Sequence, residues 1–301
     1  MSDERVALER AAALGIQYVE SVPSRPVRPS ATIAELREVL DVPLADEPTD
    51  ALTVVEELAR DADPGLAQMG SGRYFGFVIG GVLPAALAAD WLTSAWDQNA
   101  GLALPTPAAA VVEEVAGRWL KELLGIPAHA SFAVVTGCQV AHTTALAAAR
   151  NHVLAGVGYD VERAGLIGAP AIRVVAGAKR HGTIDRALRF VGLGTANIEV
   201  VPADDQGRMS VDGLRAALAS GGGPTIVCAQ LGEVNTGACD DLEAIADAAS
   251  AAGAWLHVDG AFGLWAAASP KLRHLAAGIE RADSWATDAH KRQLQLRKLA
   301  A

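Results

Sequence analysis

The pattern of apolar and polar positions changes at about residue 131. Beyond that point, short apolar runs alternate with amphipathic stretches. Apolar strands that alternate with helices are typical of an α/β fold with a mainly parallel sheet covered by helices on both faces. The pattern predicts strands at 131–136, 171–177, 197–203, 224–230, 254–260 and 282–287, and helices at 139–156, 183–192, 210–221 and 241–253.

The first part of the chain follows another pattern. A helix is expected before the proline-rich stretch SVPSRPVRPS, followed by short amphipathic helices at 32–40 and 50–62 and apolar helices up to Leu124. We therefore expect an N-terminal helical and extended arm at 1–70, a large domain at 71–291 and a separate tail at 292–301.

Composition narrows the class of protein. With 51% hydrophobic and 20% charged residues the chain is globular, and its net charge of −10 argues against a nucleic-acid partner. The N-terminus lacks a signal-peptide core, and the most apolar stretch falls short of the ~20 apolar residues that a membrane span needs. The three cysteines lack zinc-type spacing. We expect a cytoplasmic enzyme with no membrane partner and no metal.

Polar residues gather just after the predicted strands, where ligands bind in parallel sheets. At Gly137 the chain turns into a helix whose first N–H groups suit a phosphate, although an ordinary turn is the alternative. Asp259 ends an apolar strand, so its buried carboxylate needs a cationic partner. A pyridinium nitrogen is one such partner, and the alternative is an ordinary capping or salt-bridge aspartate.

Two histidines and a lysine extend this set of candidates. His181 is placed to stack on a flat ring, or simply to begin a helix. His257 is interpreted as a hydrogen-bonded core histidine, and Lys291 as either a surface lysine or an amine for Schiff-base chemistry. A phosphate cradle, a ring stacker, an acid for a ring nitrogen and an amine for an aldehyde together indicate pyridoxal phosphate.

The segments that carry these residues occur in a familiar order: TGCQVAH, HGTIDRA, GEVNTGACDDLEAIAD, WLHVDGAFG and ADSWATDAHK. They resemble the group II pyridoxal-phosphate-dependent amino acid decarboxylases. The resemblance implies a fold-type-I large domain, decarboxylation of an L-amino acid to its amine and CO2, and a homodimer at full length.

It also implies roles for individual residues. Lys291 matches the lysine that holds the cofactor, Asp259 the partner of the ring nitrogen and His181 the stacking histidine. Ala261 matches the residue under the ring, and the phosphate contacts match Gly137, Cys138, Gln139 and His290. The substrate mouth matches segments that contain Phe77, Val78, Ile79 and Asn99, although an apolar packing segment would look the same.

After Lys291 the chain reads KRQLQLRKLAA and departs from the family pattern. We expect a truncated large domain without its C-terminal small domain. A non-catalytic fragment or pseudoenzyme remains an alternative, and another fold-type-I enzyme such as an aminotransferase is a lesser one. The substrate stays open.

Overall fold

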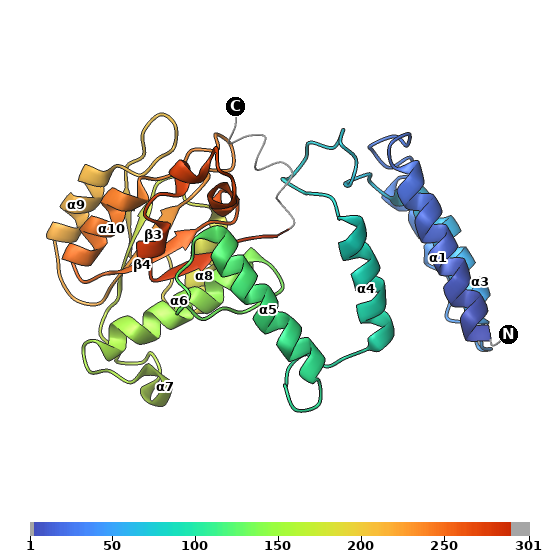
Figure 1. Cartoon of the computed structure of the whole chain (residues 1–301), viewed down its shortest axis with the longest axis horizontal. Helices are drawn as coiled ribbons and strands as arrows, with labels where there is room; N and C mark the ends of the chain where they lie inside the picture. The colour runs from blue at the N-terminus through green and yellow to red at the C-terminus, as the bar shows by residue number, and fades with distance from the viewer. Residues whose placement is uncertain (1–2, 290–301) are drawn as a thin grey trace. The chain divides into compact units, whose positions relative to one another are not determined.

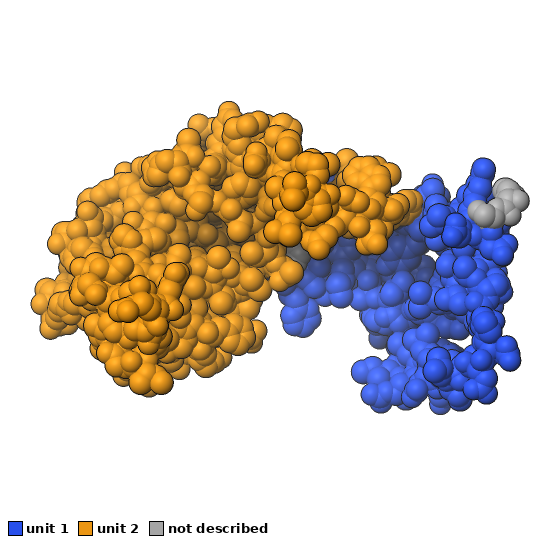
Figure 2. Space-filling view, turned by 90° about the horizontal axis from the view of Figure 1, so that it is seen from below, with its two compact units in different colours: residues 1–83 blue, residues 84–301 orange. Residues whose placement is uncertain are grey.

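The computed structural model describes residues 3–289. The chain divides into two compact units, 1–83 and 84–301, which are coloured separately in Figure 2. His290, Lys291 and the tail at 292–301 lie outside the described residues.

The first unit is helical, as its pattern predicts. It contains α1 (Asp3–Ser21), α2 (Ile33–Leu40), α3 (Ala51–Ala62) and a short 3₁₀ helix, η1 (Asp63–Gly65). Thr32 and Glu35 form a reciprocal capping box at the start of α2, which satisfies N–H groups that would otherwise lack partners. Helix α1 packs on α3.

The second unit contains the predicted parallel sheet (Figure 1). Its strands are β1 (Arg173–Gly177), β2 (Ile198–Val201), β3 (Thr225–Gln230), β4 (Trp255–Asp259) and β5 (Ser284–Ala286). The order is β2-β1-β3-β4-β5, and every pairing is parallel. The carboxyl ends of all five strands therefore meet at one edge.

Helices of the second unit alternate with these strands. They are α4 (Pro84–Trp96), α5 (Pro107–Leu124), α6 (Cys138–Ala155), α7 (Val161–Ala164), α8 (Gly182–Phe190), α9 (Val211–Ala219) and α10 (Leu242–Ala251). Three 3₁₀ helices that the sequence pattern did not predict connect β4 to β5: η2 (Leu264–Ala268), η3 (Arg273–Ala276) and η4 (Ile279–Arg281).

Two apolar clusters lie on opposite faces of the sheet, and each takes alternate residues of the same strands. Val175, Val227 and Val258 belong to the cluster that includes α9 and α10. Val174, Ile226 and Cys228 belong to the cluster that includes α6 and α8. Because side chains alternate across a strand, His257 and Asp259 share the α6 face with Cys228, which pairs with His257 in register.

The predicted strand at 131–136 is wrong. The described structure has no strand there, although the strand predictions at 171–177 and 282–287 are confirmed. A strand needs a hydrogen-bonded neighbour, and none of the five described strands pairs with this segment. Its side chains stay partly in solvent, with Phe132 39% and Val134 67% exposed. Among the described helices, none is both long and apolar enough to cross a bilayer.

Candidate active site

Asp259 ends β4 at the carboxyl edge of the sheet, beside Gln230 of β3 and Ala286 of β5. Its side chain is 6% exposed, and Oδ1 accepts the N–H of Ala261 at 3.1 Å. A side chain at the next residue, Gly260, would lie 2.7 Å from Leu264 Cβ. The close turn after β4 thus requires glycine, and it fixes the backbone that holds the carboxylate.

Helix α6 begins directly over this edge. Its N-cap, Gly137, has φ 123°, a conformation that disfavours other residues, and it brings no side-chain oxygen to the first turn. Such a helix start favours anions because its N–H groups and dipole face outward. Cys138 and His142 lie one turn apart, so both project from the same face of α6.

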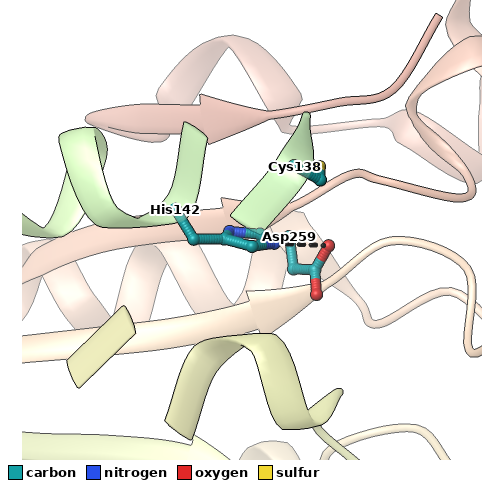
Figure 3. Close-up of side chains that lie close together, drawn as sticks. All are labelled: Cys138, His142 and Asp259. Carbon is teal, nitrogen blue, oxygen red and sulfur yellow. Dashed lines mark ion pairs between the residues drawn. The ribbon is translucent and has the colours of Figure 1, made fainter. Parts of the chain in front are cut away.

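His142 points at Asp259, as Figure 3 shows, with Cys138 beside them. Its Nε2 lies 3.4 Å from Asp259 Oδ1, within ion-pair range. The contact does not meet the geometry of a hydrogen bond, and Nε2 is a buried polar atom without a hydrogen-bond partner among the described residues. We interpret the contact as a long, loosely aligned ion pair.

The carboxylate of Asp259 is ionised in these surroundings. Burial raises the pKa of Asp259. The contact with His142 and the charge of that imidazole lower it by more than burial raises it, so the pKa lies below its usual value. An ionised carboxylate in a dry site is poised for a cationic partner.

Behind His142 lies His257, which confirms the interpretation of His257 as a hydrogen-bonded core histidine. His142 Nδ1 is 3.0 Å from His257 Nε2, and His257 Nδ1 is 2.9 Å from Ser284 Oγ. Burial, and then the neighbouring imidazole of His142, lower the pKa of His257 to about 3. His257 is therefore neutral at physiological pH.

His181 is the N-cap of α8, the structural alternative that its position allowed. Its Nδ1 accepts the backbone N–H of Thr183 at 3.3 Å and contacts Thr183 Oγ1 at 2.8 Å. The imidazole itself is exposed. Gln139 Nε2 donates to Thr183 O at 3.3 Å, which ties the start of α6 to the turn that carries His181.

The structure therefore gathers most of the predicted cofactor residues at one edge: Gly137, Cys138, Gln139, His181, Asp259 and Ala261. Of the predicted substrate residues, Phe77, Val78 and Ile79 belong to the first unit. Phe77 is 91% exposed. Asn99 belongs to the second unit, in the connection between α4 and α5, where its Oδ1 accepts the N–H of Gly101 at 2.9 Å.

Sequence reasoning gave no role to His142. The signal was present, because His142 follows Cys138 by one helical turn directly after the candidate phosphate turn. A histidine on an apolar helix face is not distinctive until the strand that it faces is known.

Buried polar atoms that lack partners indicate which kind of ligand fits the carboxyl edge of the sheet. Gln139 Oε1, His142 Nε2 and Gln230 Oε1 are buried without a hydrogen-bond partner in the described part of the chain. Together with an ionised carboxylate and a helix start, they fit a flat cationic ring with polar substituents and a phosphate. Cys138, His142 and Asp259 also bring one sulfur, one nitrogen and one oxygen within 4.8 Å. The ion-pair contact, however, assigns His142 and Asp259 to each other.

A parallel α/β sheet with these residues at its carboxyl edge defines a fold-type-I pyridoxal-phosphate domain. The family model described as the pyridoxal-dependent decarboxylase conserved domain matches residues 34–299. The chain belongs to the pyridoxal-dependent decarboxylase family, whose cofactor is pyridoxal phosphate.

Known relatives agree with this assignment. The chain is 31% identical to tryptophan decarboxylase 1 of Oryza sativa subsp. japonica over 96% of this chain and 59% of that protein. It is 31% identical to human cysteine sulfinic acid decarboxylase over 85% of this chain and 52% of that protein. The apo crystal structure of the mouse protein CSAD has a TM-score of 0.87 at 28% identity, over 95% of this chain and 61% of that one.

A further solved structure carries the cofactor. The crystal structure of Oryza sativa TDC with PLP and tryptamine matches with a TM-score of 0.84 at 28% identity, over 97% of this chain and 61% of that chain. The chain thus spans roughly 50–60% of the length of these relatives.

Proposed function

We propose that the protein binds pyridoxal phosphate and removes the α-carboxylate of an L-amino acid as CO2, leaving the amine. One observation carries the proposal: a buried, ionised Asp259 stands at the carboxyl edge of a sheet in a chain of this family. The family match does not favour an aminotransferase of the same fold.

When bound, the cofactor supplies an electron sink for the carbanion that remains after CO2 leaves. The chain's own residues supply orientation and charge. Asp259 would accept the ring N–H and keep that nitrogen protonated, since a carboxylate with a depressed pKa favours the cationic form of its partner. The first turn of α6, at Gly137, Cys138 and Gln139, would hold the phosphate through backbone N–H groups.

The remaining roles follow the family resemblance. His181 would lie against the open face of the ring, where its exposed imidazole could deliver a proton to Cα. The proton-bearing nitrogen would be Nε2, because Nδ1 accepts the N–H of Thr183. Ala261 would lie under the ring, His290 would contact the phosphate and Lys291 would hold the cofactor aldehyde.

Substrate choice would rest on Phe77, Val78, Ile79 and Asn99. The relatives named above act on tryptophan and on cysteine sulfinic acid, which differ in size and charge. We propose an α-amino acid substrate without choosing between aromatic and acidic side chains.

We also propose that the working enzyme is a cytoplasmic homodimer. Helix α4 exposes Trp91, Leu92 and Trp96 by 41%, 50% and 63%. Apolar groups of this size on one helix support a covering partner, and a second copy is the partner typical of the family. Light scattering would measure the mass in solution.

Cofactor titration tests the function. Purified protein is mixed with pyridoxal phosphate, reduced with borohydride and digested, and the modified peptide is located by mass spectrometry. We expect the modification at Lys291, its loss in Lys291→Ala, and CO2 release from one or more amino acids by the unmodified protein. Modification spread over surface lysines, with equal uptake by Lys291→Ala, would overturn the assignment.

A further inference from the structure

A continuous chain of polar contacts runs behind Asp259 through the α6 face of the sheet. Trp255 Nε1 donates to Ser284 Oγ at 2.8 Å, and Ser284 Oγ lies 2.9 Å from His257 Nδ1. His257 Nε2 lies 3.0 Å from His142 Nδ1, and His142 Nε2 lies 3.4 Å from Asp259 Oδ1. We refer to these five residues as the relay.

Donor and acceptor rules fix which proton faces the carboxylate at the end of the relay. Asp259 is ionised and can only accept, so His142 must carry a proton on Nε2. Because His257 is neutral, it donates from one ring nitrogen and accepts at the other. Ser284 Oγ accepts the indole N–H of Trp255. The proton that faces the carboxylate is therefore the one on His142 Nε2.

The middle of the relay is closed off from solvent. His142 and His257 are completely buried, and their rings meet edge to face with centroids 5.3 Å apart. Trp255 and Ser284 are half-buried and line a surface groove beside β5. The relay therefore comes closest to the surface at the groove by Ser284, and its other end is the carboxylate in the candidate cofactor site.

We propose that His142 is a positioning residue for the cofactor nitrogen: backed by His257 and Ser284, it orients Asp259 and keeps it charged toward the ring. This inference rests on the proposed function, because it acts through the contact between Asp259 and the ring nitrogen. The long, loosely aligned contact of 3.4 Å leaves room for the pair to tighten when a cationic ring binds.

The experiment compares two ligands that differ at a single atom. Dissociation constants are measured for pyridoxal phosphate and for its analogue with C–H in place of the ring nitrogen. His142→Leu removes the donor to Asp259 and should weaken binding of pyridoxal phosphate about tenfold, the size expected for a hydrogen bond to a charged group. Binding of the carbon analogue should not change, since it offers Asp259 no N–H.

Two further variants complete the design. His142→Gln keeps an N–H that can reach Asp259 and should recover most of the loss. His152→Leu makes the same substitution on the same helix, where the His152 ring contacts the Trp255 ring but carries none of the relay's hydrogen bonds. It should leave both constants unchanged. Thermal unfolding confirms that each variant is folded before titration.

Two outcomes overturn the relay's role alone: His142→Leu weakens both ligands equally, which means a structural role, or it weakens neither. A different outcome removes the proposed function as well. If Asp259→Asn binds both ligands as the unmodified protein does, Asp259 does not contact the ring nitrogen, and the role of His142 falls with it.

Histidine nitrogen NMR gives a readout that needs no cofactor. In protein labelled with ¹⁵N-histidine, we expect His257 to be neutral and His142 to carry a proton on Nε2. A neutral His142 protonated only on Nδ1 would place a lone pair against the carboxylate and would overturn the relay.

Discussion

Asp259 and Asp240 are two buried aspartates close to the carboxyl ends of neighbouring strands, and their pKa values move in opposite directions. Asp259 is 4% exposed and Asp240 is 7% exposed. The pKa of Asp259 lies below its usual value, whereas burial raises the pKa of Asp240 to about 6. Burial alone therefore does not decide the charge of a carboxylate in this fold.

The partners of the two carboxylates explain the difference. Asp240 accepts the backbone N–H groups of Met209 and Gln230, each at 2.7 Å, and these neutral donors only partly offset its burial. Asp259 faces the imidazole of His142, whose contact and charge outweigh burial. One carboxylate ties two backbone segments together, and the other is held ready for a cation.

Removing the charge of Asp259 should have the largest effect. Asp259→Asn would leave the ring nitrogen without an anionic partner, and we expect the rate of CO2 release to fall about 10²-fold or more, as for other electrostatic contacts at a reacting centre. Steady-state kinetics at saturating cofactor measure this loss. Asp240→Asn is the matched control. An equal loss of activity in that variant would show that the two aspartates do not differ in function.

Replacing His142 with Leu should make Asp259 resemble Asp240. Removing one member of a buried ion pair costs about 3–5 kcal/mol, measured at pH 7 by urea unfolding. In the unmodified protein, the lowered pKa of Asp259 means that its contribution to stability is present above its unfolded pKa of 3.8 and is lost as pH falls through the folded pKa. In His142→Leu, burial dominates, so the contribution should instead be lost as pH rises.

If the pH dependence of His142→Leu keeps the sign seen in the unmodified protein, His142 does not control the charge of Asp259. His142→Gln serves as the control because it retains a donor at nearly the same reach. Its pH dependence should stay close to that of the unmodified protein.

Asp240 gives the opposite pH dependence in the unmodified protein. Because its folded pKa of about 6 exceeds the unfolded value of 3.8, its contribution is fully present below pH 3.8 and is lost as pH rises through 6. The gap in unfolding free energy between the unmodified protein and Asp240→Asn should narrow by up to about 3 kcal/mol over this range. A gap that stays constant across pH 4–7 would show that Asp240 is ionised throughout.

The sequence predicted where Asp259 lies in the sheet but not its contact with His142. The strand at 254–260 and its terminal aspartate follow from a local apolar run, so Asp259 could be placed at the sheet edge from the sequence alone. His142 could not be assigned, since its contacts with His257 and Asp259 join residues more than a hundred positions apart. They exist only once α6 packs on β4.

The same limit explains the wrong prediction at 131–136. Its apolar pattern is that of a strand, but strand identity depends on a pairing partner, which local pattern does not contain. The 3₁₀ helices between β4 and β5 were missed for a related reason, because short turns of this kind follow tertiary packing more than periodicity.

The smallest expected effect concerns Cys228, whose thiol lies next to His257 in the sheet register. Burial, and then the charge of Asp259, raise the pKa of Cys228 to about 12. Because burial is the larger cause, neutralising the carboxylate in Asp259→Asn should speed labelling of Cys228 by a thiol reagent at pH 8 by less than about tenfold, the change that a pKa shift of one unit would bring. Mass spectrometry of timed samples follows Cys228 separately from the half-buried Cys239. A much larger acceleration would mean that the negative charge of Asp259, and not burial, keeps this thiol protonated. The charge of Asp259 would then act on a neighbouring strand more strongly than burial does, contrary to the order of causes for Cys228.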